Sequence, residues 1–196
     1  MNNIVRQSLE EAAAGLQALL ADTATQDQIA KAGALLATSL KNGGRVFSCG
    51  NGGSMCDAMH FAEELSGRYR DSRAPLAAAS ISDAGHISCT ANDFGYEFVF
   101  SRYLEAHARK GDVLLAISTS GKSKNILMAV EAAKKIGVSV IGLMGRGDTP
   151  LGQVADIRIA TPAGRYADRV QELHIKVIHT LIELVERQLF PENYKS

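Results

Sequence analysis

Two short, almost wholly apolar runs limit most strongly what this chain can fold into. Val113–Ile117 and Val138–Leu143 contain hardly any polar side chains, which is typical of parallel strands covered on both faces. The segment between them, Asn125–Ile136, has helical spacing and predicts a crossover helix. This alternation indicates an α/β fold, a three-layer α/β/α sandwich around a central parallel sheet. Three further β-rich runs predict the remaining strands, at Arg45–Cys49, Leu76–Ile81 and Ile157–Ala160.

Helices are predicted at both ends of the chain. Apolar residues recur at helical spacing over Asn3–Ala21, and again from Thr25, a candidate N-cap, to Leu40. Ala167–Leu189 predicts a long C-terminal helix with a broad apolar stripe. These helices offer more apolar surface than one small sheet needs, so we expect other copies of the chain to cover the excess. The alternative is that all three helices pack on their own sheet.

The composition argues against several classes of function. The 21 basic and 21 acidic residues cancel, and no basic cluster marks a surface for nucleic acid or an anionic membrane. No apolar run approaches the ~20 residues that span a bilayer, and no secretory signal is visible. Three cysteines, Cys49, Cys56 and Cys89, suit reduced thiols better than a disulfide framework. We therefore expect one cytoplasmic domain, 1–196, without a nucleic-acid or membrane partner.

A glycine-rich loop follows the first predicted strand. Cys49–Ser54 has the sequence CGNGGS and precedes a helix that we expect to begin near Met55. Glycines permit a tight turn and a close approach of a ligand to backbone N–H groups, and the helix N-terminus adds partial positive charge. The dinucleotide fingerprint Gly-x-Gly-x-x-Gly does not fit, so no nucleotide cofactor is expected. Taken alone, the loop is explained equally well as a structural turn.

A second loop, rich in hydroxyl groups, follows the strand Val113–Ile117. It ends in Gly-Lys-Ser, but a nucleotide P-loop requires a glycine where this chain has Ala116. A serine-rich helix N-cap without a ligand is one interpretation. Because open α/β sheets bind ligands outside the carboxyl ends of their strands, two such loops on neighbouring strands favour a phosphate site. Its hydroxyl donors would be Ser118, Thr119, Ser120 and Ser123.

Several separate motifs agree in order and spacing along nearly the whole chain. They are Gly50–Ser54 followed by Asp57–Glu64, then Ser118–Ser123, then Tyr166–His174 with His179. Together they resemble the bacterial phosphoheptose isomerases, a family with the SIS (sugar isomerase) fold. The chain departs from the family pattern at Met55 and in the turn Gly145–Pro150, and neither position is expected to take part in chemistry.

The resemblance implies an isomerase that interconverts sedoheptulose 7-phosphate and D-glycero-D-manno-heptose 7-phosphate, for lipopolysaccharide or capsule. This reaction moves a proton between adjacent carbons through an enediol, which suits a carboxylate base and an imidazole acid. The resemblance implies Glu64 as the base and His179 as the acid, with Asp168 orienting the acid. It also implies a zinc ion on His60, Glu64, Gln171 and His179, and nitrogen and oxygen ligands suit zinc. The implied substrate contacts are Asn51, Gly52, Gly53, Glu64, Asn92, Asp93, Ser118, Thr119, Ser120, Ser123 and Gln171.

The spacing of these residues along their helices constrains how they can meet. His60 and Glu64 are four residues apart and share one helix face, although a plain surface pair has the same spacing. Gln171 and His179 are eight residues apart, about 12 Å along a straight helix. One ion can touch both only if the helix bends or two subunits contribute. We therefore expect active sites at subunit interfaces, in line with the homotetramer that the resemblance implies.

Two other functions stay open. Some SIS proteins are non-catalytic binding modules that contact a replication initiator protein, and such relatives are expected to lack the acid, the base or the metal ligands. A different isomerase of the same fold would act on a pentose or amino-hexose phosphate. The presence of Glu64 and His179 argues against the first alternative, and only the detailed motif match argues against the second.

Overall fold

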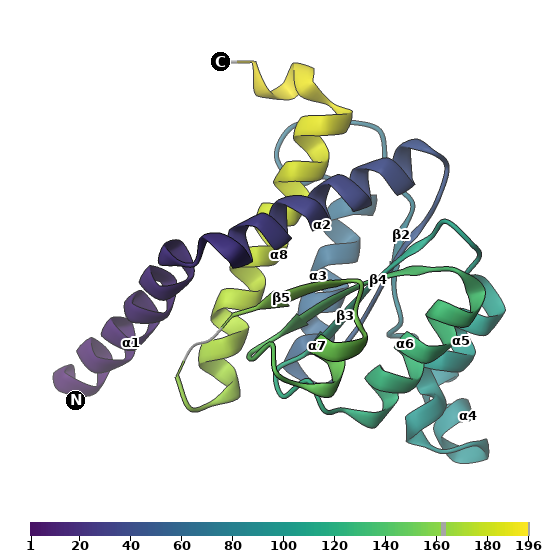
Figure 1. Ribbon diagram of the computed structural model, residues 1–196, viewed down its shortest axis with the longest axis horizontal. Coiled ribbons are helices and arrows are strands. Elements are labelled where there is room, and N and C mark those ends of the chain that lie inside the picture. Colours follow the sequence, from purple (N-terminus) through teal and green to yellow (C-terminus); the bar gives the residue numbers. More distant parts are fainter. Residues whose placement is uncertain (162–163, 196) are drawn as a thin grey trace.

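A five-stranded parallel sheet forms the centre of the fold in the computed structural model, which describes residues 1–161 and 164–195 (Figure 1). Its strand order is β2-β1-β3-β4-β5, and every pairing is parallel. All five predicted strands are confirmed, with ends that differ from expectation by no more than two residues. The strands are β1 (Val46–Cys49), β2 (Ala78–Ser80), β3 (Val113–Ser118), β4 (Ser139–Met144) and β5 (Ile157–Ala160).

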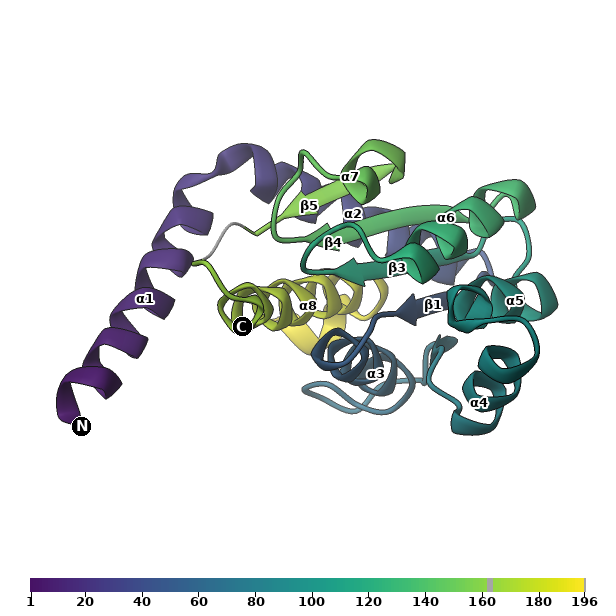
Figure 2. The ribbon, with the colours of Figure 1, turned by 90° about the horizontal axis from the view of Figure 1, so that it is seen from below.

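Helices cover both faces of the sheet and complete the predicted three-layer sandwich. Helices α2, α3 and α8 pack on one face, and α4, α5, α6 and α7 pack on the other. Figure 2 shows α3 beside α8, and α5 beside α6. The bounds are α1 (Asn2–Ala21), α2 (Thr23–Lys41), α3 (Gly53–Ser66), α4 (Ala84–Asp93), α5 (Val99–His107), α6 (Lys124–Ile136), α7 (Pro150–Val154) and α8 (Ala167–Leu189), with short 3₁₀ turns η1 (Tyr96–Phe98) and η2 (Pro191–Tyr194).

Strand β3 shows why the central runs are continuously apolar. Leu114 and Ala116 join the core under α5 and α6, whereas Leu115 and Ile117 join the core under α2, α3 and α8. Successive side chains of a strand point to opposite faces, so a strand covered on both sides needs apolar residues at every position.

Two details of the helix predictions are wrong. The N-cap of α2 is Asp22 rather than Thr25, because the Asp22 carboxylate accepts hydrogen bonds from both the backbone N–H and the hydroxyl of Thr25. The second is an omission: Asn92 and Asp93 end α4, a helix that the sequence patterns do not predict and that Asp83 caps by accepting from the backbone N–H of His86. The segment of α4 has only one fully buried residue, so its sequence lacks the apolar periodicity that predicts a helix.

The terminal helices divide into two kinds. Helices α2 and α8 pack closely, with Gly33 against Leu184, and both contribute to the core. Helix α1 extends away from the sheet, and only Gly15 and Leu19 of its residues are buried (Figures 1 and 2). In the described ranges, no helix combines the length and the apolar character that a membrane crossing requires.

Candidate active site

The glycine loop places the start of α3 against α8. Gly52 has a φ of +56°, a conformation that side chains disfavour, and α3 begins at Gly53, two residues before the expected Met55. A Cβ atom on Gly53 would lie 2.6 Å from the side-chain nitrogen of Gln171. Glycine is therefore required for the close approach of the Gln171 amide to this loop, as well as for the turn.

The serine loop turns back on itself at the end of β3. The Gly121 N–H donates to the carbonyl and the hydroxyl of Ser118, and the hydroxyls of Ser118 and Ser123 lie 3.2 Å apart. Ser123 occupies the N-cap position of α6 but makes no side-chain cap bond. Its hydroxyl is therefore directed toward the loop interior rather than used for capping, which favours a ligand-binding role.

The two loops are joined directly. Strands β1 and β3 are neighbours, and the Asn51 and Asn125 side-chain amides exchange two hydrogen bonds of 2.9 and 2.8 Å. The Tyr96 hydroxyl also donates to the Asn51 side-chain oxygen at 3.1 Å. The sequence does not predict Tyr96 or Asn125 as site residues. For Asn125, the available signal is its side-chain amide at the start of the helix that follows the serine loop.

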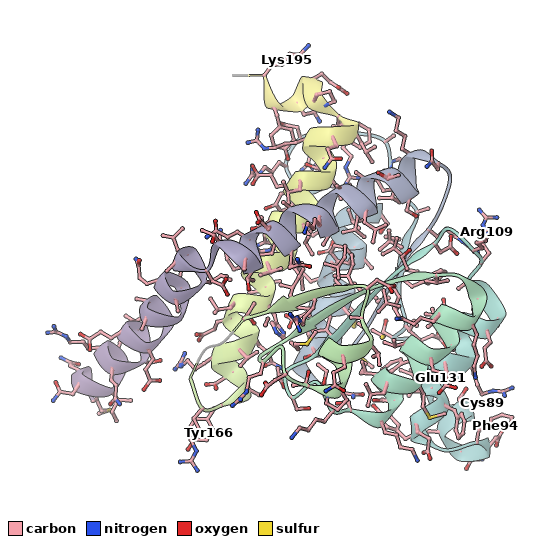
Figure 3. All side chains as sticks on the ribbon, viewed as in Figure 1. Cys89, Phe94, Arg109, Glu131, Tyr166 and Lys195 are labelled. Atoms are coloured by element: carbon pink, nitrogen blue, oxygen red, sulfur yellow. The ribbon has the colours of Figure 1, made fainter. Side chains whose placement is uncertain are left out.

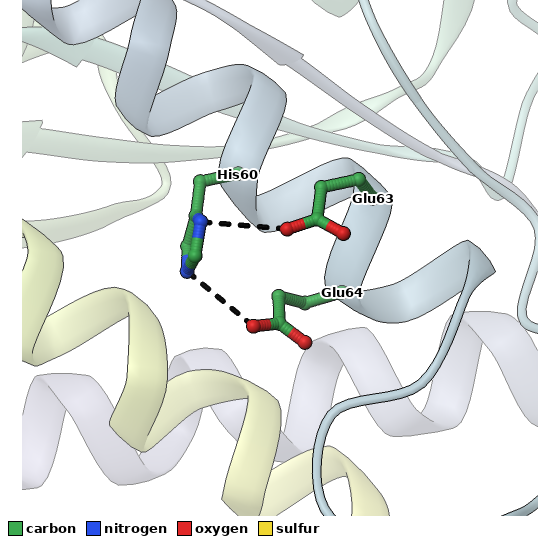
Figure 4. A group of neighbouring side chains, drawn as sticks. All are labelled: His60, Glu63 and Glu64. Atoms are coloured by element: carbon green, nitrogen blue, oxygen red, sulfur yellow. Dashed lines mark ion pairs between the residues drawn. The ribbon is translucent and has the colours of Figure 1, made fainter.

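His60 forms the centre of a cluster of acid–base side chains. Its Nε2 atom lies 3.0 Å from Nε2 of His179 on α8 and 3.5 Å from Oε1 of Glu64. Its Nδ1 atom lies 3.4 Å from Oε1 of Glu63, which the sequence analysis did not single out (Figure 4). Three residues of α3 therefore provide donor atoms within 4.8 Å of one another, and His179 adds a fourth residue from α8.

Burial shifts the pKa values of Glu64 and His179 in opposite directions. Burial is the main cause that raises the pKa of Glu64, and the neighbouring Glu63 carboxylate raises it further. Burial is also the main cause that lowers the pKa of His179, and the nearby His60 adds to this effect. Displaced carboxyl and imidazole pKa values in one cluster are typical of a functional site.

Asp57 is a further carboxylate beside this cluster, one helical turn before His60. Its Oδ2 atom is buried without a hydrogen-bond partner among the described residues, and burial raises its pKa to about 6. Asp57 opens the motif Asp57–Glu64, and the sequence alone assigns it no role. A buried carboxylate oxygen without a partner in the described part of the chain, close to His60, is a feature that packing alone does not explain.

Gln171 lies apart from the histidine cluster within one chain. It is beside Gly53, seven residues before His60, or about 10 Å along α3. Helix α8 is continuous from Ala167 to Leu189, so no break brings Gln171 to His179. Asp168 is eleven residues before His179, about 16 Å away along α8, which excludes contact between them in one chain. Asn92 and Asp93 are exposed and hydrogen-bond to each other.

The distances around His60 show which of the predicted site residues meet within a single chain. Glu64 and His179 both flank His60 in a single chain, so this pair does not require a second subunit. Gln171 is too far from His60 and His179 of its own chain to share a zinc ion with them. Either Gln171 is not a zinc ligand, or it serves the site of a neighbouring chain.

Comparison with known proteins places the chain among sugar-phosphate enzymes. The SIS domain profile matches residues 9–145. The chain is 57% identical to the phosphoheptose isomerase of Photorhabdus laumondii, over 95% of this chain and 97% of that relative. It is 56% identical to the phosphoheptose isomerase of Cytophaga hutchinsonii, over 96% and 99% of the two chains.

Solved structures of phosphoheptose isomerases also resemble this chain, at lower sequence identity. The phosphoheptose isomerase of Neisseria gonorrhoeae superposes with a TM-score of 0.87 at 33% identity, covering 94% of this chain and 98% of the other. The phosphoheptose isomerase of Francisella tularensis superposes with a TM-score of 0.89 at 30% identity, covering 94% of this chain and 97% of the other. The similarity therefore extends over almost the entire length of each protein compared.

Proposed function

The chain belongs to the SIS-domain family, among the phosphoheptose isomerases, and we propose that it interconverts sedoheptulose 7-phosphate and D-glycero-D-manno-heptose 7-phosphate. The observation that carries this proposal is the contact of His60 with both Glu64 and His179, on the helix that the glycine loop opens. A carboxylate and an imidazole held together in this way are the acid–base pair that ketose–aldose isomerisation requires.

The two groups divide the proton transfers between carbon and oxygen. Glu64 removes the proton from the carbon beside the carbonyl and returns it to the neighbouring carbon of the enediol. Its raised pKa makes it a stronger base than an ordinary glutamate. His179, whose pKa is lowered, is neutral near pH 7 and can both give and take the proton at oxygen.

The donor set around His60 fits a zinc ion. Nε2 of His60 lies 3.0 Å from Nε2 of His179 and 3.5 Å from Oε1 of Glu64, and imidazole nitrogens and carboxylate oxygens are ligands that zinc prefers. We propose His60, Glu64 and His179 as ligands from one chain, with Gln171 supplied by a neighbouring chain. When bound, zinc would polarise the sugar carbonyl as a Lewis acid.

Zinc binding should depend on His60. We expect His60→Gln to reduce the zinc retained after dialysis from about one ion per chain to a small fraction of that. Elemental analysis of the purified protein measures this. His107→Gln, which changes an exposed histidine on α5 outside the cluster, should retain the ion. Equal zinc in the wild type and the His60 variant would place the metal elsewhere.

The serine loop is the proposed phosphate site. Ser118, Thr119, Ser120 and Ser123 supply hydroxyl donors beside Gly121 and the start of α6. The sugar chain extends from there toward Asn51, Gly52 and Gly53. Asn92 and Asp93 are further proposed contacts, which is supported by Tyr96, three residues after Asp93, whose hydroxyl donates to Asn51.

Loss of a single hydroxyl should weaken substrate binding. Ser120→Ala and Ser123→Ala should each cost roughly 1.5–3 kcal/mol, which is about 10- to 150-fold in Kd. Calorimetry in a Glu64→Gln background measures binding without turnover. Thr38→Ala, which removes an exposed hydroxyl from α2, is the matched control and should bind normally. Unchanged affinity in both serine variants would place the phosphate outside this loop.

The substrate itself is tested by a panel of ketose phosphates. We expect turnover of the seven-carbon ketose phosphate, with the product identified by mass and NMR, and little turnover of pentose or amino-hexose phosphates. Activity on a shorter sugar would favour a different isomerase of this fold. The comparisons do not support a non-catalytic module that contacts a replication initiator protein, since the similar proteins are named as isomerases.

A homotetramer with active sites at its interfaces is the proposed assembly. Five large apolar residues of α1 have exposed fractions between 44% and 72%. Figure 3 shows side chains along α1 that extend away from the remainder of the fold. An exposed apolar helix of this size indicates an interface, and a second copy is its simplest occupant. The five residues are Ile4, Val5, Leu9, Leu16 and Leu20.

Two broader expectations accompany this function. We propose that residues 1–196 form one domain, which is supported by the contribution of α2 and α8, from opposite ends of the chain, to one core. We also propose a cytoplasmic location and a role in the supply of heptose for lipopolysaccharide or capsule. The three cysteines are free, which suits a reducing compartment.

A further inference from the structure

Arg73 makes an unusual set of contacts at the end of the helix that carries Glu64. Its Nη2 atom donates to the carbonyl of Glu64 at 2.6 Å, and its Nη1 atom donates to the carbonyls of Leu65 and Gly67 at 2.7 and 3.1 Å. The last carbonyls of an α-helix have no partner within the helix. Arg73 therefore caps α3 from the segment that follows it.

The charge of Arg73 also suits this position. The carbonyl end of a helix carries partial negative charge, and the last turn of α3 has no basic residue of its own. A guanidinium offers several N–H donors in one plane, so a single side chain can satisfy several carbonyls at once. Lysine, which has one small ammonium group, could not reproduce this arrangement.

A buried carboxylate holds Arg73 in place. The Arg73 Nε atom donates to Oε1 of Glu186 on α8 at 2.7 Å, and both side chains are 1% exposed. The Tyr194 hydroxyl donates to the other Glu186 oxygen at 2.7 Å, and the Phe190 ring lies 5.8 Å from the guanidinium carbon. The C-terminal turn thus closes over the ion pair. Such a pair contributes little net stability, since desolvation offsets the attraction, so stability alone does not explain it.

We propose that Arg73 is a positioning residue for isomerisation, which fixes the last turn of α3 and thereby the direction of the Glu64 carboxylate toward His60. This inference rests on the proposed function. The bond from Arg73 ends on the carbonyl of Glu64 itself, so it fixes the backbone from which the catalytic side chain extends. The Glu64 carboxylate lies 3.5 Å from His60, and displacements of about 1 Å in such arrangements reduce turnover strongly.

A double variant separates positioning from folding. Arg73→Met alone leaves Glu186 buried without its partner and should lower Tm. Arg73→Met with Glu186→Leu replaces both charges by apolar groups and should recover much of the Tm that the single variant loses, although the capped carbonyls remain without a donor. In the double variant we expect kcat for the heptose phosphate to stay on the order of 10- to 100-fold low. KM should change by less than about threefold, because the serine loop is not altered.

Recovery of kcat in the double variant would contradict the positioning role. If kcat recovers together with Tm in the double variant, the pair serves folding only, and the positioning role is wrong. Arg187→Met, which removes an exposed arginine from the last turn of α8, is the control and should keep both kcat and Tm.

Hydrogen exchange gives a readout that does not depend on the substrate. Without the Arg73 cap, amides in the last turn of α3 and at its C-cap, residues 63–67, should exchange on the order of tenfold faster in the double variant than in the wild type. Unchanged exchange would overturn the capping role whatever the kinetics show. Failure of the wild type to turn over any heptose phosphate, with exchange still accelerated in the variant, would reject the proposed function and retain the cap.

Discussion

Replacement of Glu64 by glutamine should lower turnover of sedoheptulose 7-phosphate by about 10²–10⁴-fold, because an amide cannot take the proton from carbon. Glutamine has nearly the same shape, so the contact with His60 and the affinity for substrate should remain measurable. Steady-state kinetics and calorimetry on the same preparation test both parts. Retention of more than about a tenth of wild-type turnover would reject Glu64 as the base.

The neighbouring Glu63 is a well-matched control for this experiment. It lies on the same helix, one residue away, and also approaches His60, at 3.4 Å from Nδ1. Its side chain is 63% exposed, whereas that of Glu64 is 17% exposed. Because the Glu63 carboxylate faces solvent rather than the buried part of the cluster, Glu63→Gln should keep most of the activity. If Glu63→Gln is instead the inactive variant, the base has been assigned to the wrong carboxylate.

Mixed oligomers of Glu64→Gln and His179→Ala subunits should show almost no recovered activity, less than about a few per cent of the wild type. The reason is the position of both residues beside His60 of one chain, so every site in the mixture lacks one of them. Native mass spectrometry of isotopically labelled subunits verifies exchange and reports the number of chains in the assembly. Substantial recovery in verified mixed oligomers would show that Glu64 and His179 of one site come from different chains.

A second mixture, of Glu64→Gln and Gln171→Ala subunits, should give the opposite result. If it completes the site of a neighbouring chain, Glu64→Gln subunits can provide an intact Gln171 to Gln171→Ala subunits that retain Glu64. Activity should then return in this mixture although it does not in the first. The two mixtures together identify which residue crosses the interface, and they use the same measurement.

The sheet and the helices α2, α3, α6 and α8 were predictable because their sequence patterns are strong, whereas α4, α5 and α7 were not predicted. Strand β3 is buried at all six positions, and such a run has few alternatives to a strand covered on both faces. The bounds Ala167–Leu189 of α8 were predicted without error, since its apolar stripe is broad. Helix α4 was missed because almost all of its residues are partly exposed and it is defined by its cap at Asp83.

The active-site cluster was only partly predictable. The spacing of His60 and Glu64 places them on one helix face, whereas His179 is 119 positions further along the chain. Only the packing of α3 against α8 brings the two histidines to 3.0 Å. The contact between Asn51 and Asn125 has the same origin, because it depends on the adjacency of β1 and β3 rather than on any local pattern.

The limited burial of α1 has a consequence for how the protein behaves on dilution. Helices in water take most of their stability from tertiary packing, and α1 buries only Gly15 and Leu19 within its own chain. In the proposed homotetramer, association with other subunits supplies its remaining support, and association follows mass action. As subunits separate, α1 should unwind while the sheet persists, and a protease would then cleave the first twenty residues before any strand. If the proposed assembly is correct, the helical content of this segment should rise with subunit concentration, whereas that of the folded core should not.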